Sequence, residues 1–519
     1  MPSHSGLYTA LVTVSAAGLI VAAAAVHDQA PPLASTGYVA SSSPPEAAVP
    51  QVWPRARRLI DADERRRESA VRAAAGRNRP FLDRSLNRPT AVLPGPGRYT
   101  LRDLPARALV RGVSGVRLRL PLVVAPGARL VISRRRLLLR SSPRVRATIM
   151  VVDATLAVRG TRIRSAGPDT DQRDGRAYIL VQGGRMILRG AHVSHLGFAT
   201  GLTSGVAWMH RFGVPSTGGA VDSTFSRNLF GVYSSGAAGL RFVRDKFLNN
   251  DVYGFDPHGA PPGMSNDPGL GSNDFLVRDS LAAYNGRHGF IFSSGCDDNR
   301  VLDSVSRNNG GSGFVIDDGK PRAGLVRTSN NNVLQGIEAR DNSDVGVVIE
   351  GGSANEIRNA LLVNNAFGVR ITDATRDTVV VDSQIHATRW TALAVNERAR
   401  AQVARVSIDG ATVGVDSSGG ARLQDVTVTD AVVAGLRLQP TDVTAGVTVG
   451  GLGRRAVDGI QQVQTSTWRS DQADASGLTQ VLSTLRHQVW LVLLITPVVL
   501  WSIARLVQRT RNLTTRTGL

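Results

Sequence analysis

Short apolar strands that begin with glycine recur along the middle of this chain at nearly constant intervals. The spacings between successive glycines are 23, 35, 24, 33, 22, 46 and 21 residues. The interval of 46 residues is two coils, and those of 35 and 33 are one coil with an insertion. A strand-containing period of 22–24 residues predicts a solenoid in which each repeat stacks on the next. The glycines that mark the repeat are Gly231, Gly254, Gly289, Gly313, Gly346, Gly368, Gly414 and Gly435.

Asparagine recurs four residues before the glycine in five successive coils. Its amide can bond the same amide one coil away, and the residue tolerates left-handed backbone. Such ladders favour a parallel β-helix over a leucine-rich repeat, which would show periodic leucine and a helix in each unit. We therefore predict an all-β fold, a single-stranded right-handed parallel β-helix over residues 80–450. The five asparagines are Asn250, Asn285, Asn309, Asn342 and Asn364.

Two apolar segments flank the predicted solenoid. Residues 7–26 are uncharged and long enough to cross a bilayer, so residues 1–29 are predicted to be a signal anchor or a signal peptide. Residues 487–507 are predicted to be a transmembrane helix. Four arginines follow residue 504, which predicts that residues 508–519 form a cytoplasmic tail. The β-helix would then lie outside the cytoplasm.

Two polar segments connect these parts. Residues 30–79 are predicted to be a linker followed by a basic helical segment, and residues 451–486 a polar tether. The whole chain carries a formal charge of +20, nearly all of its cations being arginine. A positive field of this size implies an anionic partner, and an extracytoplasmic location argues against nucleic acid. We expect an acidic polysaccharide, with the membrane and a polysaccharide synthase or export complex as further candidate partners.

The composition also limits metal and thiol chemistry. Cys296 is the single cysteine, so no disulfide can form within the chain, and we predict a small packed residue rather than a nucleophile. Nine scattered histidines do not predict a zinc site, and no cofactor is expected. Asp297 and Asp298, with the polar insertion at 260–272, are alternative oxygen ligands for Ca²⁺.

Side chains alternate along a strand, so each repeat glycine fixes which residues share a face. The first and third residues after the glycine are mostly apolar and are predicted to face the core. The second and fourth residues are predicted to face solvent, which brings Tyr233, Asp256, His258 and Asp317 onto one exposed sheet. Coils stack about 4.8 Å apart, so His258 is one rung from Ser293 and two from Asp317. A long shallow groove with such groups suits an extended polymer.

Two stretches of this sheet resemble a known family. Tyr-Gly-Phe-Asp-Pro-His and the later His-Gly-Phe-Ile-Phe-Ser resemble the periplasmic mannuronan C5-epimerases of alginate biosynthesis, which are pectate-lyase-like right-handed β-helices. The resemblance covers roughly residues 220–375. It implies that His258 is the base that removes the C5 proton of a uronate, with Asp256 in the same motif. The next aspartate of the family motif is Gly259 here, and the arginine that neutralises the uronate carboxylate falls on Ser294.

The chemistry of that reaction indicates further candidates. Removal of the C5 proton leaves a carbanion, which needs a base of near-neutral pKa and a positive group on the carboxylate. Arg287 and Arg370 are the arginines that could supply the charge. The predicted catalytic residues are His258, Asp256, Tyr233 and Asp317, and the predicted substrate-binding residues are Arg287, Ser293, Glu350 and Arg370.

Three functions remain open from the sequence. The first is a uronate C5-epimerase or lyase with His258 as the base. The second is a non-catalytic carbohydrate-binding scaffold for envelope or exopolysaccharide export. The third is a glycoside hydrolase with paired carboxylates chosen from Asp256, Asp317 and Asp318, since an inverting mechanism needs two acids about 6.5–9.5 Å apart.

Overall fold

A computed structural model describes residues 54–113, 115–141, 146–167, 176–199, 201–259, 270–319, 327–451, 455–458 and 467–468. The predicted signal segment, the transmembrane helix, the cytoplasmic tail and the linker up to residue 53 lie outside these ranges. Within the ranges given, no helix is both long enough and apolar enough to cross a membrane.

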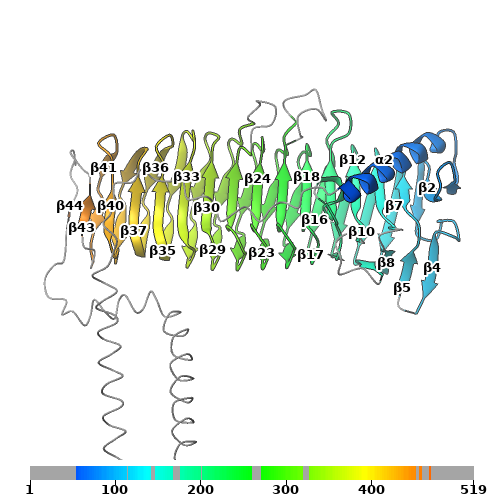
Figure 1. The fold of residues 1–519 in the computed structure, drawn as a ribbon, viewed down its shortest axis with the longest axis horizontal. Coiled ribbons are helices and arrows are strands. Elements are labelled where there is room, and N and C mark those ends of the chain that lie inside the picture. Colours follow the sequence, from blue (N-terminus) through cyan, green and yellow to red (C-terminus); the bar gives the residue numbers. More distant parts are fainter. Residues whose placement is uncertain are drawn as a thin grey trace, which may run out of the picture. The chain divides into compact units, whose positions relative to one another are not determined.

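Strands make up most of the described chain, and each coil contributes one strand to each of three parallel faces (Figure 1). One coil holds β24 (Phe290–Ser293), β25 (Arg300–Leu302) and β26 (Val305–Arg307). Each pairs in parallel with the strand at the same position of the next coil, as β24 does with β27 (Phe314–Asp317). The predicted all-β parallel β-helix is therefore confirmed.

The three faces are named here by their strands. The site face consists of β2 (Thr90–Leu93), β6 (Leu122–Val124), β9 (Ile149–Val152), β12 (Ile179–Gln182), β15 (Val206–Met209), β18 (Val232–Ser235), β21 (Phe255–His258), β24, β27, β30 (Val345–Glu350), β33 (Phe367–Thr372), β40 (Ala434–Arg437) and β43 (Arg455–Asp458). The middle face consists of β3 (Gly97–Thr100), β7 (Ala128–Ser133), β10 (Thr155–Arg159), β13 (Arg185–Arg189), β16 (Thr217–Val221), β19 (Arg241–Val243), β22 (Leu276–Arg278), β25, β28 (Val333–Gln335), β31 (Glu356–Arg358), β34 (Thr378–Val381), β36 (Arg400–Ala404), β38 (Gly420–Gln424) and β41 (Val443–Ala445).

The third face consists of β4 (Leu109–Gly112), β5 (Gly115–Leu118), β8 (Arg136–Arg140), β11 (Arg162–Ala166), β14 (His192–Ser194), β17 (Thr224–Ser226), β20 (Lys246–Leu248), β23 (Leu281–Ala283), β26, β29 (Glu338–Arg340), β32 (Leu361–Val363), β39 (Thr427–Thr429), β42 (Thr448–Val449) and β44 (Thr467–Trp468). The long strands β35 (Gln384–Val395) and β37 (Ser407–Ser417) join the third face to the site face. Among the described strands, the antiparallel pairs are β4 with β5, and β1 (Phe81–Asp83) with β2.

The core runs inside the coils and is built from stacked columns of apolar side chains. Phe290 and Phe314 occupy the same position of adjacent coils, and their rings stack with centroids 5.1 Å apart. Phe225 and Phe247 repeat this arrangement on the third face, with centroids 5.5 Å apart. The first and third residues after each repeat glycine are buried on the site face, as predicted.

Asparagine side chains form a ladder inside the turn before the site face. The Asn285 carboxamide oxygen accepts from the backbone N–H and the side-chain amide of Asn250, at 3.1 and 2.9 Å. The residue before each ladder asparagine has a positive φ, so the left-handed position and the ladder position are neighbours rather than one residue. The last rung is Asn365, which accepts from Asn342, and the prediction of Asn364 was wrong. Asn364 occupies the left-handed position with a φ of 53°.

The α-helix α2 (Pro54–Ala74) lies along the first coils of the site face and contacts β1, β2 and β6 (Figure 1). Ala70 and Ala74 are buried there, and the Asp63 carboxylate accepts from the Tyr178 hydroxyl at 3.2 Å. The helical segment expected near residues 53–79 is thus present and packs on the β-helix. At the other end, β43 and β44 pair with β40 and β42. The coils therefore continue past residue 450 into the segment predicted to be a tether.

The second residue after each repeat glycine points away from the inner core but is not exposed. Tyr233, Ile291, Val315 and Val348 are buried in a second apolar cluster on the site face, and the Asp256 side chain is fully buried. The prediction that this whole column faces solvent was wrong. Alternation determines which face a side chain takes, but apolar neighbours in the same column exclude water from that face.

The ladder predicts that substitutions at two adjacent asparagines change the stability of the protein by different amounts. Asn365→Ala should lower the free energy of unfolding by about 2–4 kcal/mol, because Asn342 and the Ala339 carbonyl lose buried hydrogen bonds. Asn364→Gly should change it by less than about 1 kcal/mol, because glycine suits a positive φ. Urea unfolding of both variants measures this difference. Equal losses would contradict the assignment.

A second ladder contains a buried acid where neighbouring coils have serine. Asp245 accepts from the Ser223 backbone N–H at 2.7 Å, and its own N–H donates to the Ser280 hydroxyl at 3.1 Å. Burial raises the pKa of Asp245 from 3.8 to about 8. Because the folded-state pKa is the higher one, the protonated acid favours folding, and this stability is lost as pH rises from about 4 to about 8.

Asp245→Ser should therefore stabilise the protein at alkaline pH. We expect a gain of about 2–4 kcal/mol at pH 8 and a much smaller one at pH 4, since the variant has no carboxylate to ionise. Thermal unfolding at both pH values measures the difference. A gain that is the same at both would show that ionisation of Asp245 is not its cause.

Candidate functional site

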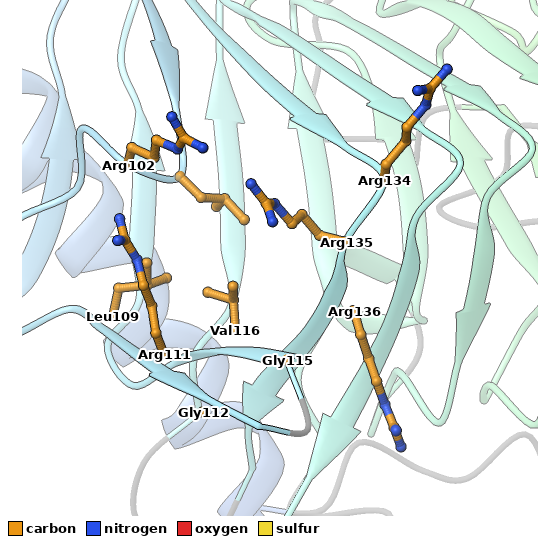
Figure 2. Close-up of a pocket in the computed structure, with 10 residues that line it drawn as sticks. Arg102, Leu109, Arg111, Gly112, Gly115, Val116, Arg134, Arg135 and Arg136 are labelled. Atoms are coloured by element: carbon orange, nitrogen blue, oxygen red, sulfur yellow. The ribbon is translucent and has the colours of Figure 1, made fainter.

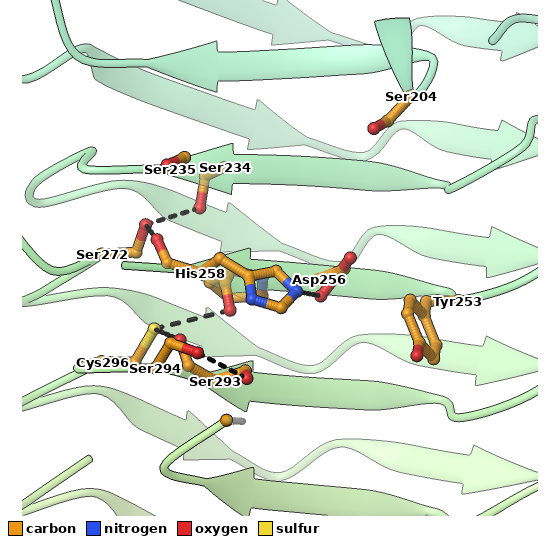
Figure 3. Close-up of polar contacts among 12 residues, drawn as sticks. Ser204, Ser234, Ser235, Tyr253, Asp256, His258, Ser272, Ser293, Ser294 and Cys296 are labelled. Atoms are coloured by element: carbon orange, nitrogen blue, oxygen red, sulfur yellow. Dashed lines mark hydrogen bonds and ion pairs between the residues drawn. The ribbon is translucent and has the colours of Figure 1, made fainter. Parts of the chain in front are cut away.

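His258 ends β21 on the site face, and Asp256 precedes it by two residues on the same strand. The His258 Nε2 atom lies 2.7 Å from Asp256 Oδ1, close enough for an ion pair, although the angle is not that of a good hydrogen bond (Figure 3). The Asp256 side chain is completely buried, whereas 29% of the His258 side chain is exposed. The pair therefore consists of a carboxylate that has no contact with solvent and an imidazole that is partly exposed to it.

The strand around this pair is held by serines of adjacent coils. The Ser272 hydroxyl donates to the His258 carbonyl at 2.7 Å and lies 3.0 Å from the Ser234 hydroxyl (Figure 3). The Ser235 hydroxyl donates to the Gly259 carbonyl at 3.2 Å. These contacts hold the backbone at the end of β21, directly after the imidazole.

Three predicted site residues surround His258. Tyr233 lies one coil before Asp256, and its ring centroid is 5.7 Å from that of His258. Ser293 is the register partner of His258, and Asp317 is the register partner of Ser293. Burial raises the pKa of Asp317, while a hydrogen bond from Ser293 and the charge of His258 partly offset this effect. The structure thus brings together Asp256, His258, Tyr233, Ser293 and Asp317.

The column continues into a group of acids. Glu350 is the register partner of Asp317, and burial together with the charge of Asp317 raises its pKa to about 7. Burial raises the pKa of Asp318 to about 6. The Asp318 carboxylate accepts backbone N–H groups of Ser329 and Gly352 at 2.9 and 3.0 Å. Asp318 therefore stabilises a turn, whereas Asp317 and Glu350 carry protons at higher pH than ordinary carboxyls do.

The two arginines predicted to neutralise a uronate lie elsewhere. Arg287 donates to the Tyr253 hydroxyl at 2.7 Å, beside the other end of β21 from His258. Arg370 lies four coils beyond Asp256, where it is 3.5 Å from an Asp344 oxygen. Arg370 is therefore several rungs from His258 on the same face, and its role as a substrate-binding residue stays a prediction.

Arg327 is an arginine beside this site that the sequence did not indicate. Its side chain passes Gly295 and reaches Gly259, where a methyl group would lie 3.7 Å from Nη1. Nε and Nη1 are buried, and neither has a hydrogen-bond acceptor among the described residues. The pKa of His210 is lowered, first by the burial of His210 itself and second by the positive charge of Arg327. Arg327 follows an insertion in its coil. The period of the repeat therefore did not predict which residues of the neighbouring coils lie beside it.

Glycines make room for this guanidinium. Met209 and Ser235 are register partners, as are Ser235 and His258, so His210, Gly236 and Gly259 take equivalent positions in three coils. A side chain at Gly259 would approach the Ser294 carbonyl to 1.9 Å. An aspartate at this position, as in the family motif, would therefore need a different backbone here.

The described residues do not contain a metal site. No group of three or more His, Cys, Asp or Glu side chains within them is arranged to hold an ion. The Asp297 carboxylate already accepts the backbone and side-chain N–H groups of Asn330. Most of the insertion considered for Ca²⁺ lies outside the described residues.

Cys296 is fully buried, as predicted, and its Sγ atom lies 3.2 Å from the Ser293 carbonyl oxygen and 3.4 Å from that of Pro257. Burial raises the pKa of this thiol well above its usual range. The residue therefore packs between two coils as an un-ionised thiol.

The family described as periplasmic copper-binding protein (NosD) matches residues 265–405, less than half of the chain. Because the described residues offer no group of metal ligands, no copper-dependent step is proposed. No curated protein sequence matched the chain.

Two solved structures have a similar fold. The periplasmic alginate epimerase AlgG is 15% identical, with a TM-score of 0.48, over 74% of this chain and 85% of that one. The A-module of the mannuronan C-5 epimerase AlgE6 from Azotobacter vinelandii is also 15% identical, with a TM-score of 0.45, over 67% of this chain and 91% of that one. Identity this low leaves the activity of this chain open.

The buried N–H groups of Arg327 predict a link between stability and anion binding. Arg327→Gln should raise the melting temperature of the ligand-free protein by about 2–4 °C, because the buried Nε and Nη1 atoms have no hydrogen-bond acceptor among the described residues, and buried donors without acceptors are costly. An oligouronate should raise the melting temperature of the wild type but not of this variant. Differential scanning fluorimetry measures both effects.

Arg300→Gln is the matched control, since Arg300 is exposed on the middle face and its loss changes the net charge equally. If both variants lose the response to the oligouronate, the net charge of the protein, and not Arg327, determines it.

Proposed function

We propose that the chain acts outside the cytoplasm on an acidic polysaccharide and removes the C5 proton of a uronate residue. The observation that carries this proposal is the 2.7 Å contact between His258 and the buried Asp256, with the guanidinium of Arg327 beside the same strand end, where its buried Nε and Nη1 atoms have no hydrogen-bond acceptor among the described residues. A base and a buried positive charge are the two groups that this reaction requires.

The buried carboxylate prepares His258 to act as a base. A hydrogen on Nε2, the nitrogen that lies 2.7 Å from the Asp256 carboxylate, would leave the lone pair on Nδ1. Nδ1 would accept the C5 proton, and the electron pair of the broken C–H bond would pass into the adjacent carboxylate. Arg327 would bind that carboxylate and stabilise the negative charge that develops on its oxygens.

The fate of the intermediate depends on a second proton carrier. Return of a proton to C5 from the opposite face gives the epimer, whereas loss of the 4-linked sugar gives an unsaturated end and makes the enzyme a lyase. Tyr233, with its ring 5.7 Å from that of His258, is one candidate donor. Asp317 is the other, because its raised pKa keeps the carboxyl protonated at a higher pH than usual.

A non-catalytic carbohydrate-binding scaffold is the second candidate. The observation that favours it is the burial of Asp256 and Tyr233 in a cluster with Ile291 and Val315. A polymer on this face would then meet mainly His258 and the acids of the following coils. Hydrolysis by paired carboxylates has less support, because Asp318 is engaged with backbone N–H groups.

Deuterium exchange at C5 tests the catalytic proposal. The full chain in detergent is incubated with polymannuronate and other polyuronates in D₂O, and proton NMR follows deuterium uptake and unsaturated ends. His258→Ala should slow the reaction by about 10²–10⁴-fold, the usual contribution of a general base. His386→Ala is the control, since His386 lies on the third face beside Asp409.

Each outcome selects between the candidates. Exchange without cleavage, lost in His258→Ala and kept in His386→Ala, supports an epimerase, and unsaturated ends support a lyase. No exchange on any uronate, with binding still measurable, overturns the catalytic proposal and leaves the scaffold.

A further inference from the structure

Arginines surround a cavity of about 380 Å³ near the N-terminal end of the described β-helix (Figure 2). Several coils lie between this cavity and β21, which carries His258. Three segments form its wall: the β4–β5 hairpin, the residues that follow β3, and the turn between β7 and β8. The ten lining residues include five arginines and no acidic residue. The cavity is therefore a second place on this chain that is suited to an anion.

The hairpin that closes the cavity is built into the first coils. β4 pairs with β5 in an antiparallel fashion, and β5 pairs in parallel with β8. Gly115 has a φ of 124°, and a side chain there would approach the Arg136 carbonyl oxygen to 2.5 Å. Glycine thus allows the hairpin to lie directly against the backbone of the arginine-bearing turn. The wall is part of the folded structure rather than a loose surface loop.

The arginines differ in direction. In Figure 2 the side chains of Arg102, Arg111 and Arg135 extend toward the same opening, whereas those of Arg134 and Arg136 extend away from it. Leu101, Leu109 and Val116 are the apolar side chains of the lining. A guanidinium binds an oxyanion through two parallel hydrogen bonds, so converging guanidinium groups can hold more than one oxyanion.

The charges of these arginines are not compensated nearby. All five lining arginines are exposed, and no ion pair to an acid is found for them among the described residues. The carboxylate next in sequence, that of Asp103, accepts the backbone N–H and the hydroxyl of Thr100 at 2.7 and 2.9 Å. Residues 98–166 contain sixteen arginines and two acidic residues. This part of the β-helix attracts anions strongly.

Exposed arginines also repeat from coil to coil beyond the cavity. On the middle face, Arg129 is the register partner of Arg98, and Arg189 is that of Arg159. Because coils lie about 4.8 Å apart, these pairs place positive charges in rows along the solenoid. Rows of this kind fit a linear polymer that carries an anionic group on each unit better than a single small anion.

We propose that the cavity formed by Arg102, Arg111 and Arg135 binds a segment of a linear acidic polysaccharide, away from the site of His258. The kind of polymer rests on the proposed function, but the location of this second site does not. Such a site would hold the chain of the polymer while another part of it reaches His258. It would also give the binding a strong dependence on salt, since surface charges carry it.

Two double variants of equal charge test the proposal. Arg111→Gln/Arg135→Gln removes two converging guanidinium groups, and Arg134→Gln/Arg136→Gln removes two that point away. Calorimetry of the full chain in detergent measures binding of oligomannuronate, with dextran as the neutral control. The first variant should bind about tenfold more weakly and with less salt dependence, and the second should bind as the wild type does. Hydrogen exchange should show ligand protection of the β4–β5 hairpin in the wild type and in the second variant, but not in the first.

Other results would overturn the proposal. Equal weakening in both double variants would mean that net charge alone attracts the polymer, and no weakening would mean that the cavity does not bind it. Binding to vesicles of anionic phospholipid without binding to oligomannuronate would indicate a contact with the membrane surface instead. Deuterium exchange at C5 in the same samples reports on His258, so failure of the proposed reaction is distinguished from failure of this second site.

Discussion

Backbone hydrogen bonds between successive coils hold equivalent residues in register, and the rest of the structure depends on this constraint. A parallel strand that slipped by one residue would exchange its core side chains for outward ones, so every column would be lost at once. The asparagine ladder strengthens the register at the turn, because each carboxamide binds both the backbone and the side chain of the preceding rung. Buried amides of this kind are costly to leave unpaired, which makes the turn specific as well as stable.

Register is also what creates the candidate site. Tyr233, Asp256 and His258 come from two coils, and Ser293 and Asp317 come from the next two. The coils bring them together because equivalent positions stack at the same short interval. Burial then separates their properties: Asp256 has no exposed surface, whereas His258 reaches solvent. A histidine held by a dry carboxylate is suited to proton transfer in a way that a solvated histidine is not.

Positive charge on this protein is divided between two different environments. Arg327 is a single guanidinium with buried N–H groups beside a candidate base, whereas the arginines of the first coils are numerous and exposed. The first environment suits stabilisation of charge on one carboxylate, since low polarity strengthens a short-range interaction. The second suits attraction and retention of a long anionic chain, which depends on many weaker contacts. A polymer-modifying protein needs both functions.

The sequence alone determined the repeat, the parallel β-helix and the columns of the inner core, because these follow from the spacing of glycine and the alternation of apolar residues. It also placed His258 next to Asp256, since both belong to one short strand.

The tertiary structure decided that Asn365, and not Asn364, completes the ladder, because only the path of the turn distinguishes two adjacent asparagines. It decided that Asp256 is buried and that Arg370 lies four coils away. It also brought Arg327 to Gly259 from beyond an insertion, where no repeat could indicate its position. Local pattern fixes the face that a side chain takes, whereas burial and long-range contact depend on what the rest of the chain places against that face.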